Sequence, residues 1–118
     1  MPRYTTDLRQ RSKDFAVAAY GLSKDTRARH PALRNACDQM FDAASSVGAN
    51  LAENDGLNTR KELAARYAIA LREAKETKYW LDVLHGAEPT LEPQTAPLIA
   101  ECKEFIAMMT TALKKLRT

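Results

Sequence analysis

The chain has few of the residues that interrupt helices or build metal centres. Of its 118 residues, four are glycine, five proline, two cysteine and two histidine. This composition is that of a helical protein rather than a strand-rich one, and it offers no cluster of zinc ligands. Aromatic residues make up only 7% of the chain. We therefore expect an aliphatic, alanine-rich core between closely packed helices.

Long apolar segments are also missing. The chain has no run of about 18 apolar residues and no apolar segment near its N-terminus of the kind that directs export. Cys37 and Cys102 have neither metal-ligand spacing nor a secretory context. We expect a reduced, cytoplasmic protein without a membrane span.

Positive charge is present but unevenly distributed. The net charge is +3, and residues 3–30 carry seven basic and three acidic side chains. Residues 59–86 are also basic, with six against four. Arg9, Arg11 and Lys13 form the densest cluster. Such a cluster can meet phosphate, but most runs of this kind on small helical proteins are solvated faces.

Apolar residues recur with helical spacing in four segments, predicted as helices over about 6–27, 31–55, 59–85 and 95–117 of a single domain, residues 1–118. Three of these segments keep a strict alternation of four- and three-residue steps, the pattern of a buried stripe. The stripes are Leu33, Cys37, Met40, Ala44, Val47 and Leu51; Leu63, Tyr67, Ala70, Ala74, Thr77, Leu81 and Leu84; and Ile99, Cys102, Ile106, Met109, Leu113 and Leu116. The first segment is looser, with Leu8, Phe15, Ala18 or Ala19, and Leu22. The predicted fold is all-α: a single up-down-up-down antiparallel four-helix bundle.

Turn residues support the limits of the second and third helices. Gly56 is placed to end the second helix in a left-handed conformation. Thr59 and Glu62 have the spacing of a capping box, in which each side chain bonds a backbone N–H at the start of the third helix. Gly86 is placed to end that helix, and three prolines follow between residues 87 and 97.

Motifs for catalysis or metal binding are absent. A di-iron site in a bundle needs two Glu-x-x-His pairs facing inward, and the only approximation is Asp82-x-x-His85. No glycine-rich phosphate loop and no nucleophile elbow occurs. Cys37 and Cys102 both lie at core positions, where packing is the expected role. We expect a protein that is not an enzyme and has no metal or cofactor.

A second apolar stripe on the third helix goes beyond what one bundle needs. Ile69, Trp80 and Val83 project roughly 100° to 160° away from the buried stripe, and Glu73 and Glu76 lie between them. A stripe that holds the only tryptophan predicts an oligomer interface. The alternative is that Trp80 lies across a neighbouring helix of its own bundle, partly exposed.

Two stretches resemble one bacterial family. They are SVGANLAENDGLNTRKEL (46–63) and YAIALREAKETKYWLDVL (67–84). The family comprises small four-helix-bundle proteins encoded by intervening sequences within 23S rRNA genes. The residues that match its pattern are Ser46, Asn50, Ala52, Glu53, Gly56, Thr59, Glu62, Ile69, Ala70, Glu73, Glu76 and Leu81. Two residues depart from it: Asn54 replaces a usual glycine, and Leu57 replaces a usual arginine that could contact phosphate.

This resemblance implies an assembly and a nucleic-acid association, but no reaction. It implies homopentamers in which bundles pack side by side around a central channel. One branch of the family, the accessory variability determinant of diversity-generating retroelements, binds a reverse transcriptase and nucleic acid. For most other members no activity is established.

Asn50 and Glu53 lie three residues apart near the end of the second helix, so they share a face. They could bond the following turn or the start of the third helix, which would be a structural latch. They could instead cross a subunit boundary or line a channel. Buried without partners, either side chain would cost on the order of 1–3 kcal/mol or more, so both must be paired.

Two functions therefore stay open. The first is a non-enzymatic, homo-oligomeric scaffold, a pentamer by resemblance, that binds ribosomal or other RNA, or DNA. Its candidate contact residues are Arg9, Arg11, Lys13, Arg60, Lys61 and Arg66. The alternative is a protein–protein interaction module whose basic residues only keep it soluble.

Overall fold

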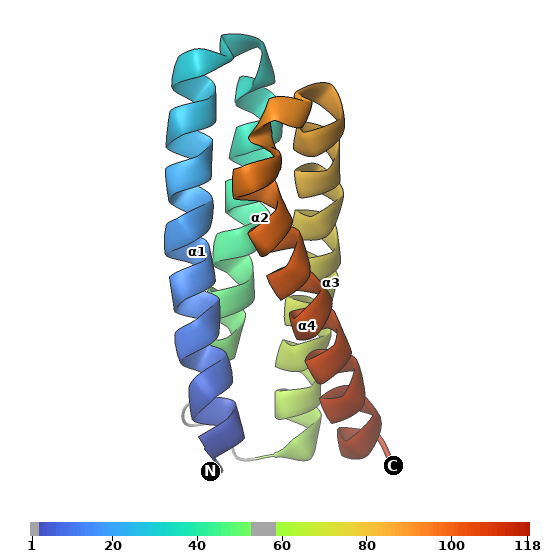
Figure 1. The fold of residues 1–118 in the computed structure, drawn as a ribbon. Helices are drawn as coiled ribbons and strands as arrows, with labels where there is room; N and C mark the ends of the chain where they lie inside the picture. The colour runs from blue at the N-terminus through green and yellow to red at the C-terminus, as the bar shows by residue number, and fades with distance from the viewer. Residues whose placement is uncertain (1–2, 53–58) are drawn as a thin grey trace.

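Four long helices follow one another along the chain, each antiparallel to the one before it (Figure 1). The computed structural model describes residues 3–52 and 59–118, with side chains from residue 8 onward. Its elements are α1 (Arg3–Arg29), η1 (Pro31–Leu33), α2 (Arg34–Ala52), α3 (Arg60–Ala87), η2 (Pro89–Leu91) and α4 (Glu92–Leu116), where η marks a short 3₁₀ turn. No strand occurs among these residues, so the prediction of an all-α four-helix fold is confirmed. Gly56 and Glu53 lie outside the described residues.

The buried stripes of α2 and α3 follow the predicted spacing. The α2 stripe from Cys37 to Leu51 is at most 1% exposed, and Tyr67 to Leu84 of α3 are buried as well. Leu33 and Leu63, at the start of their stripes, are only partly buried and pack against the core. The sequence period alone therefore determined which faces of these two helices are apolar and turned inward.

The buried face of α4 is rotated from the predicted one. Its buried residues are Thr95, Leu98, Cys102, Phe105, Met109 and Leu113. Ile99, Ile106 and Leu116, expected in the core, are partly buried at its edge. The reason is Phe105, whose ring packs edge-on against Phe15 of α1 with centroids 5.3 Å apart. The bulky Phe105 ring takes the inward position because burying it removes more apolar area from water than burying Ile106 would.

The end of α3 and the start of α4 differ from the predicted limits, and α1 and the start of α2 differ by two to three residues. α3 continues through Gly86 to Ala87, and Gly86 is not in the left-handed conformation that an ending glycine would adopt. The helix stops before Pro89, which cannot donate a backbone hydrogen bond. α4 begins at Glu92 rather than near Thr95, because η2 leads directly into it and Pro93 lies in its first turn.

The start of α3 has the predicted cap in a modified form. Thr59 Oγ1 accepts a hydrogen bond from the backbone N–H of Glu62 at 3.0 Å, as expected. The Glu62 carboxylate accepts from the Thr59 hydroxyl at 2.8 Å, where the capping box has it accept from the backbone of the cap residue. Thr59 is therefore the N-cap of α3, and Glu62 orients its hydroxyl.

The bundle measures 45 × 22 × 21 Å, and both chain termini lie at one end of it (Figure 1). α1 and α3 begin at that end, and α4 ends there. Helices adjacent in sequence pack along their lengths, and α1 and α4 contact each other more sparsely than these pairs do. Within the described residues, no helix is long and apolar enough to span a membrane.

Candidate nucleic-acid interface

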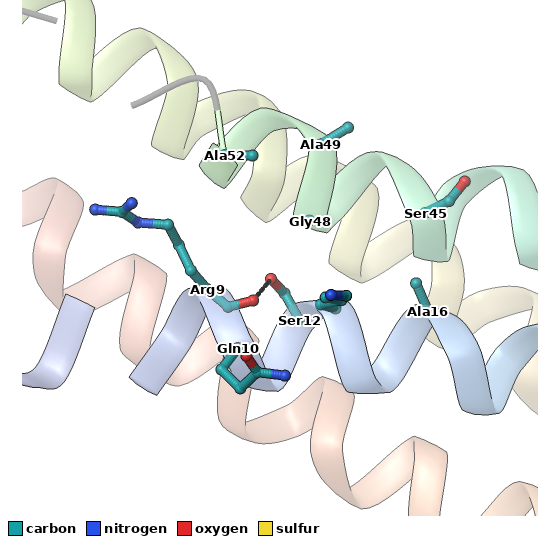
Figure 2. A pocket seen from close by; sticks show the side chains of 9 residues that line it. Arg9, Gln10, Ser12, Ala16, Ser45, Gly48, Ala49 and Ala52 are labelled. Atoms are coloured by element: carbon teal, nitrogen blue, oxygen red, sulfur yellow. Dashed lines mark hydrogen bonds between the residues drawn. The ribbon is translucent and has the colours of Figure 1, made fainter. Parts of the chain in front are cut away.

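A groove of about 510 Å³ runs between α1 and α2 on the outside of the bundle (Figure 2). Small residues form most of its wall, and Arg9 and Lys13 of α1 add two cations to it. The lining residues are Arg9, Gln10, Ser12, Lys13, Ala16, Ser45, Gly48, Ala49 and Ala52. No carboxylate is among these nine described residues, and the cations Arg9 and Lys13 suit an anionic partner.

The groove exists because small side chains face one another across the helix pair. A Cβ atom on Gly48 would lie 3.4 Å from the Ser12 hydroxyl, so the backbone of α2 approaches α1 closely there. Ser12 and Ser45 donate their hydroxyl hydrogen bonds to carbonyls of their own helices, Arg9 O at 2.9 Å and Asp42 O at 3.1 Å. Their side chains therefore stay folded against the helices and leave the space between them open.

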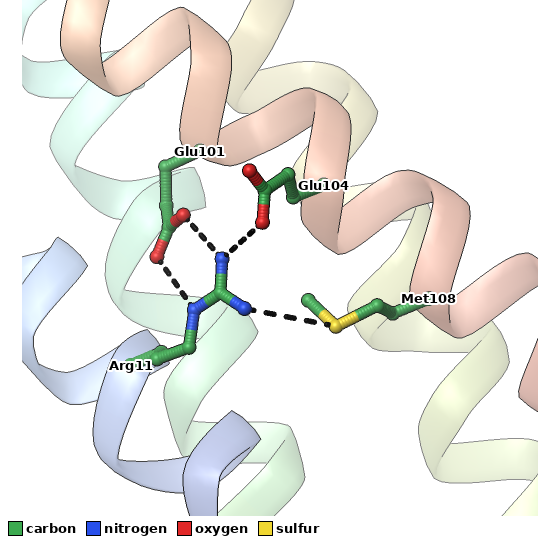
Figure 3. A network of polar contacts seen from close by, with 4 residues as sticks. All are labelled: Arg11, Glu101, Glu104 and Met108. Carbon is green, nitrogen blue, oxygen red and sulfur yellow. Dashed lines mark hydrogen bonds and ion pairs between the residues drawn. The ribbon is translucent and has the colours of Figure 1, made fainter. Parts of the chain in front are cut away.

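Arg11 lies on the other side of α1, in a network with α4 (Figure 3). It donates to Glu101 from Nε at 3.1 Å and from Nη2 at 2.5 Å, and from Nη2 also to Glu104 at 2.7 Å. Its Nη1 lies 3.9 Å from the sulfur of Met108, and its guanidinium lies 5.6 Å from the centroid of the Phe105 ring. The hydrogen bonds to Glu101, and then the one to Glu104, raise the pKa of Arg11 above its usual value. Arg11 therefore joins α1 to α4.

The three candidates on α3 have different surroundings. Arg60 donates from Nη2 to the carbonyl of Lys115 at 2.7 Å and so binds the C-terminal end of α4. Arg66 donates from Nη1 to Asn50 Oδ1 at 3.2 Å. Lys61 is exposed. The six candidate cations thus do not form one surface: Arg9 and Lys13 share the groove, and the others are distributed around the same end of the bundle.

Asn50 connects two helices. Its amide donates to Ser46 O of α2 at 2.8 Å, and its carbonyl oxygen accepts from Arg66 of α3. This is a latch within one chain, although it reaches a side chain of α3 rather than the backbone of the turn. The polar residue near the end of α2 therefore has partners on both sides.

The second stripe of α3 is partly buried within its own chain. Trp80 and Val83 pack against the core, and Ile69 is half-buried. Burial, followed by the charge of Glu76, raises the pKa of Glu73 within this stripe. Among the described residues, the exposed large apolar side chains are Val17 (64%), Tyr20 (50%) and Tyr79 (59%). Sequence reasoning missed Val17 and Tyr20, although their three-residue spacing opposite the buried stripe of α1 was readable.

Potential metal ligands do not gather in the structure. No group of three or more histidine, cysteine or acidic residues lies close enough together among the described residues to hold an ion. His85 instead lies 4.0 Å from Glu92, and His30 lies 3.7 Å from Glu88, so both histidines connect helix ends. Burial raises the pKa of the Cys102 thiol to about 12. Burial also raises the pKa of the Cys37 thiol.

The chain is similar to known proteins over nearly its whole length. A family model described as 23S rRNA-intervening sequence protein matches residues 5–111. The crystal structure of a protein of unknown function from the S23 ribosomal protein family of Bacteroides thetaiotaomicron superposes with a TM-score of 0.82. The two sequences are 26% identical, and the match covers 91% of this chain and 98% of the other. No curated protein matches the chain.

Proposed function

Because the chain belongs to the 23S rRNA-intervening sequence protein family, we propose that it is a non-enzymatic, homo-oligomeric helical scaffold that associates with RNA. The observation that carries the RNA association is the groove between α1 and α2, which holds Arg9 and Lys13 and no carboxylate among its nine described lining residues. Phosphate contacts supply most of the affinity of proteins that bind nucleic acid without strong sequence preference.

The position of the groove also supports this function. Arg9 and Lys13 lie in the first half of α1, and Arg60 and Lys61 are the first residues of α3. α1 and α3 begin at the end of the bundle where the basic last turn of α4 lies (Figure 1). An RNA strand that enters the groove would therefore pass further cations as it leaves. Arg11 stabilises the bundle, because its ion pairs with Glu101 and Glu104 hold α1 beside α4.

An electrophoretic shift with ribosomal RNA fragments tests the proposal. We expect binding at low salt that weakens steeply as salt rises, because each neutralised phosphate releases counterions. Lys13→Glu should weaken binding strongly. Lys103→Glu is the matched control, since it makes the same charge change at an exposed position of α4. Absence of a shift even at low salt, or equal effects of the two substitutions, would contradict the proposal.

A protein–protein interaction module without nucleic-acid binding is the second candidate. The observation that favours it is the exposed Tyr79, whose ring packs edge-on against Trp80 with centroids 5.2 Å apart. By family resemblance, a reverse transcriptase is one class of protein partner. Affinity for such a partner would depend on apolar burial and would change little with salt.

A further inference from the structure

One exposed stripe on α1 continues the groove along the helix. Lys13, Val17, Tyr20 and Lys24 follow steps of four, three and four residues, which places them on one face of the helix. All four are exposed, and Val17 and Tyr20 are 64% and 50% exposed. Lys13 is also a lining residue of the groove, so stripe and groove form one continuous surface.

Tyr20 has the properties of a stacking platform. Its ring packs edge-on against Phe41 of α2, with centroids 5.7 Å apart and an angle of 65° between the planes. Phe41 therefore supports the ring from one side while half of the tyrosine surface stays open. An aromatic ring held in this way loses little conformational entropy when a flat ligand stacks on it.

The charges beside Tyr20 suit phosphates. Lys13 and Lys24 make no hydrogen bond or ion pair within the described part of the chain, so both ammonium groups are available to a ligand. The rise of the helix separates these residues by about 16 Å. That length corresponds to roughly five stacked nucleotides at about 3.4 Å each. Arg27, about two turns beyond Tyr20, pairs with Asp38 at 3.3 Å, so the Asp38 carboxylate already has a cationic partner.

We infer that this surface of α1 and α2 binds single-stranded RNA, with a base stacked on Tyr20, phosphates at Lys13 and Lys24, and the neighbouring part of the strand in the groove. The inference rests on the proposed RNA association and specifies its partner. A single strand is required because a duplex keeps its bases stacked inside, where a ring on a convex helix cannot reach them. Aromatic platforms flanked by cations are the usual means of binding unpaired strands.

The groove has space for a further nucleotide of the same strand. The part of its wall formed by Ser12, Ala16, Ser45, Gly48 and Ala49 has only small side chains. The groove volume of about 510 Å³ lies in the range of small-molecule sites. A nucleotide adjoining the one on Tyr20 can enter there beside Lys13. Ala49→Phe fills this space from an exposed position of α2 and should weaken binding without disturbing the core.

Fluorescence anisotropy with a labelled oligouridylate of about ten nucleotides, which is within the size of such sites, tests the inference. Tyr20→Ala should weaken binding about five- to hundredfold, because stacking on one aromatic ring contributes a free energy of that size. Tyr20→Phe should retain the affinity of the wild type. The duplex of the same strand with oligoadenylate should bind more weakly than the single strand.

Tyr79→Ala is the matched control, because Tyr79 is similarly exposed and also packs edge-on against an aromatic ring, but lies on α3. It should leave the affinity unchanged. Equal affinities of Tyr20→Ala and Tyr79→Ala, with binding retained, would overturn the inference and leave the proposed RNA association standing. A wild type that binds neither strand nor duplex would overturn both.

A second measurement separates RNA from a protein partner on this stripe. Light scattering should give Tyr20→Ala the same mass as the wild type. A lower mass with unchanged affinity for oligouridylate would show that Val17 and Tyr20 contact another copy of the chain, and would overturn the inference. Photo-crosslinking of RNA that contains thiouridine should label the peptide that carries Tyr20, and labelling confined to other helices would contradict it.

Discussion

Two neighbouring cations of α1 show how strongly the surroundings decide the role of a residue. Two residues along an α-helix turn a side chain by about 200°, so Arg11 and Lys13 point in nearly opposite directions. Arg11 meets Glu101 and Glu104 of α4, whereas Lys13 borders the groove. The first stabilises the bundle, and only the second is placed to contact a ligand.

At the same scale, Thr59 is expected to stabilise the start of α3 through its hydroxyl. Thr59→Ala should lower the free energy of unfolding by about 0.5–2 kcal/mol, since the backbone N–H of Glu62 loses its acceptor. Chemical denaturation followed by circular dichroism measures this. Thr110→Ala is the control, because that hydroxyl bonds the Ile106 carbonyl within α4 and caps no helix end. Equal effects of the two substitutions would show that Thr59 is not the cap.

Cys102 should be unreactive in the folded protein. Burial raises the pKa of its thiol to about 12, so almost no thiolate forms at neutral pH. Because the folded state favours the protonated thiol, its contribution to stability is present below about pH 9 and is lost as the pH rises toward 12. Mass spectrometry after iodoacetamide treatment should show no modification of Cys102 until denaturant is added. Rapid modification of the native protein at neutral pH would contradict this.

At the scale of the helix, local signals and long-range packing compete at the ends. Gly86 is a plausible stop in the sequence, yet its backbone is not left-handed and α3 continues past it to Ala87. Pro89 follows directly after and ends the helix. Conversely, the prolines between α3 and α4 led to a predicted start of α4 near Thr95. The helix begins earlier, at Glu92, because Pro93 is tolerated in its first turn.

Gly86→Ala should therefore stabilise the protein. The backbone of Gly86 is not left-handed, and an added Cβ would meet no atom within 4 Å. Replacing a helical glycine by alanine should raise the free energy of unfolding by about 0.5–1 kcal/mol, because the unfolded chain loses conformational freedom. Gly21→Ala, in an equally open position of α1, should do the same. A loss of stability specific to Gly86→Ala in thermal denaturation would place the end of α3 at that residue.

At the scale of the whole molecule, the proposed assembly of copies of the chain depends on the second stripe of α3. Trp80 and Val83 pack partly against their own core, so the second stripe of α3 serves the bundle as well as any partner. Its remaining exposed area, together with Ile69 and the exposed Tyr79, is still available to a neighbour. Burying that area would contribute roughly 25 cal/mol per Å² to association.

Trp80→Glu should break the assembly and leave the helices folded, because the substitution would place an unpaired charge in the contact. Light scattering should give an oligomeric mass for the wild type and a lower mass for the variant, with unchanged circular dichroism. Asn35→Glu, which adds a charge at an exposed position of α2, is the control and should keep the wild-type mass. A monomeric wild type, or an oligomeric Trp80→Glu, would exclude Trp80 from the interface.

The sequence by itself determined the helical class and most of the buried faces. The reason is that apolar burial depends on which side chains share a helix face, and the helical repeat makes that readable from spacing alone. It also determined the Thr59 cap, since its partner lies only three residues away. The rotated face of α4 was not readable, because it depends on Phe15 of a distant helix.

Only the tertiary structure decided which charged and aromatic residues can function. Arg11 and Glu101 are 90 residues apart, and no local pattern indicates that they pair. The groove arises where the small residues of α1 and α2 meet, and Tyr20 becomes a supported platform only because Phe41 lies beside it. Contacts of this kind depend on how folded helices are placed against one another, and the period of a single helix does not contain that placement.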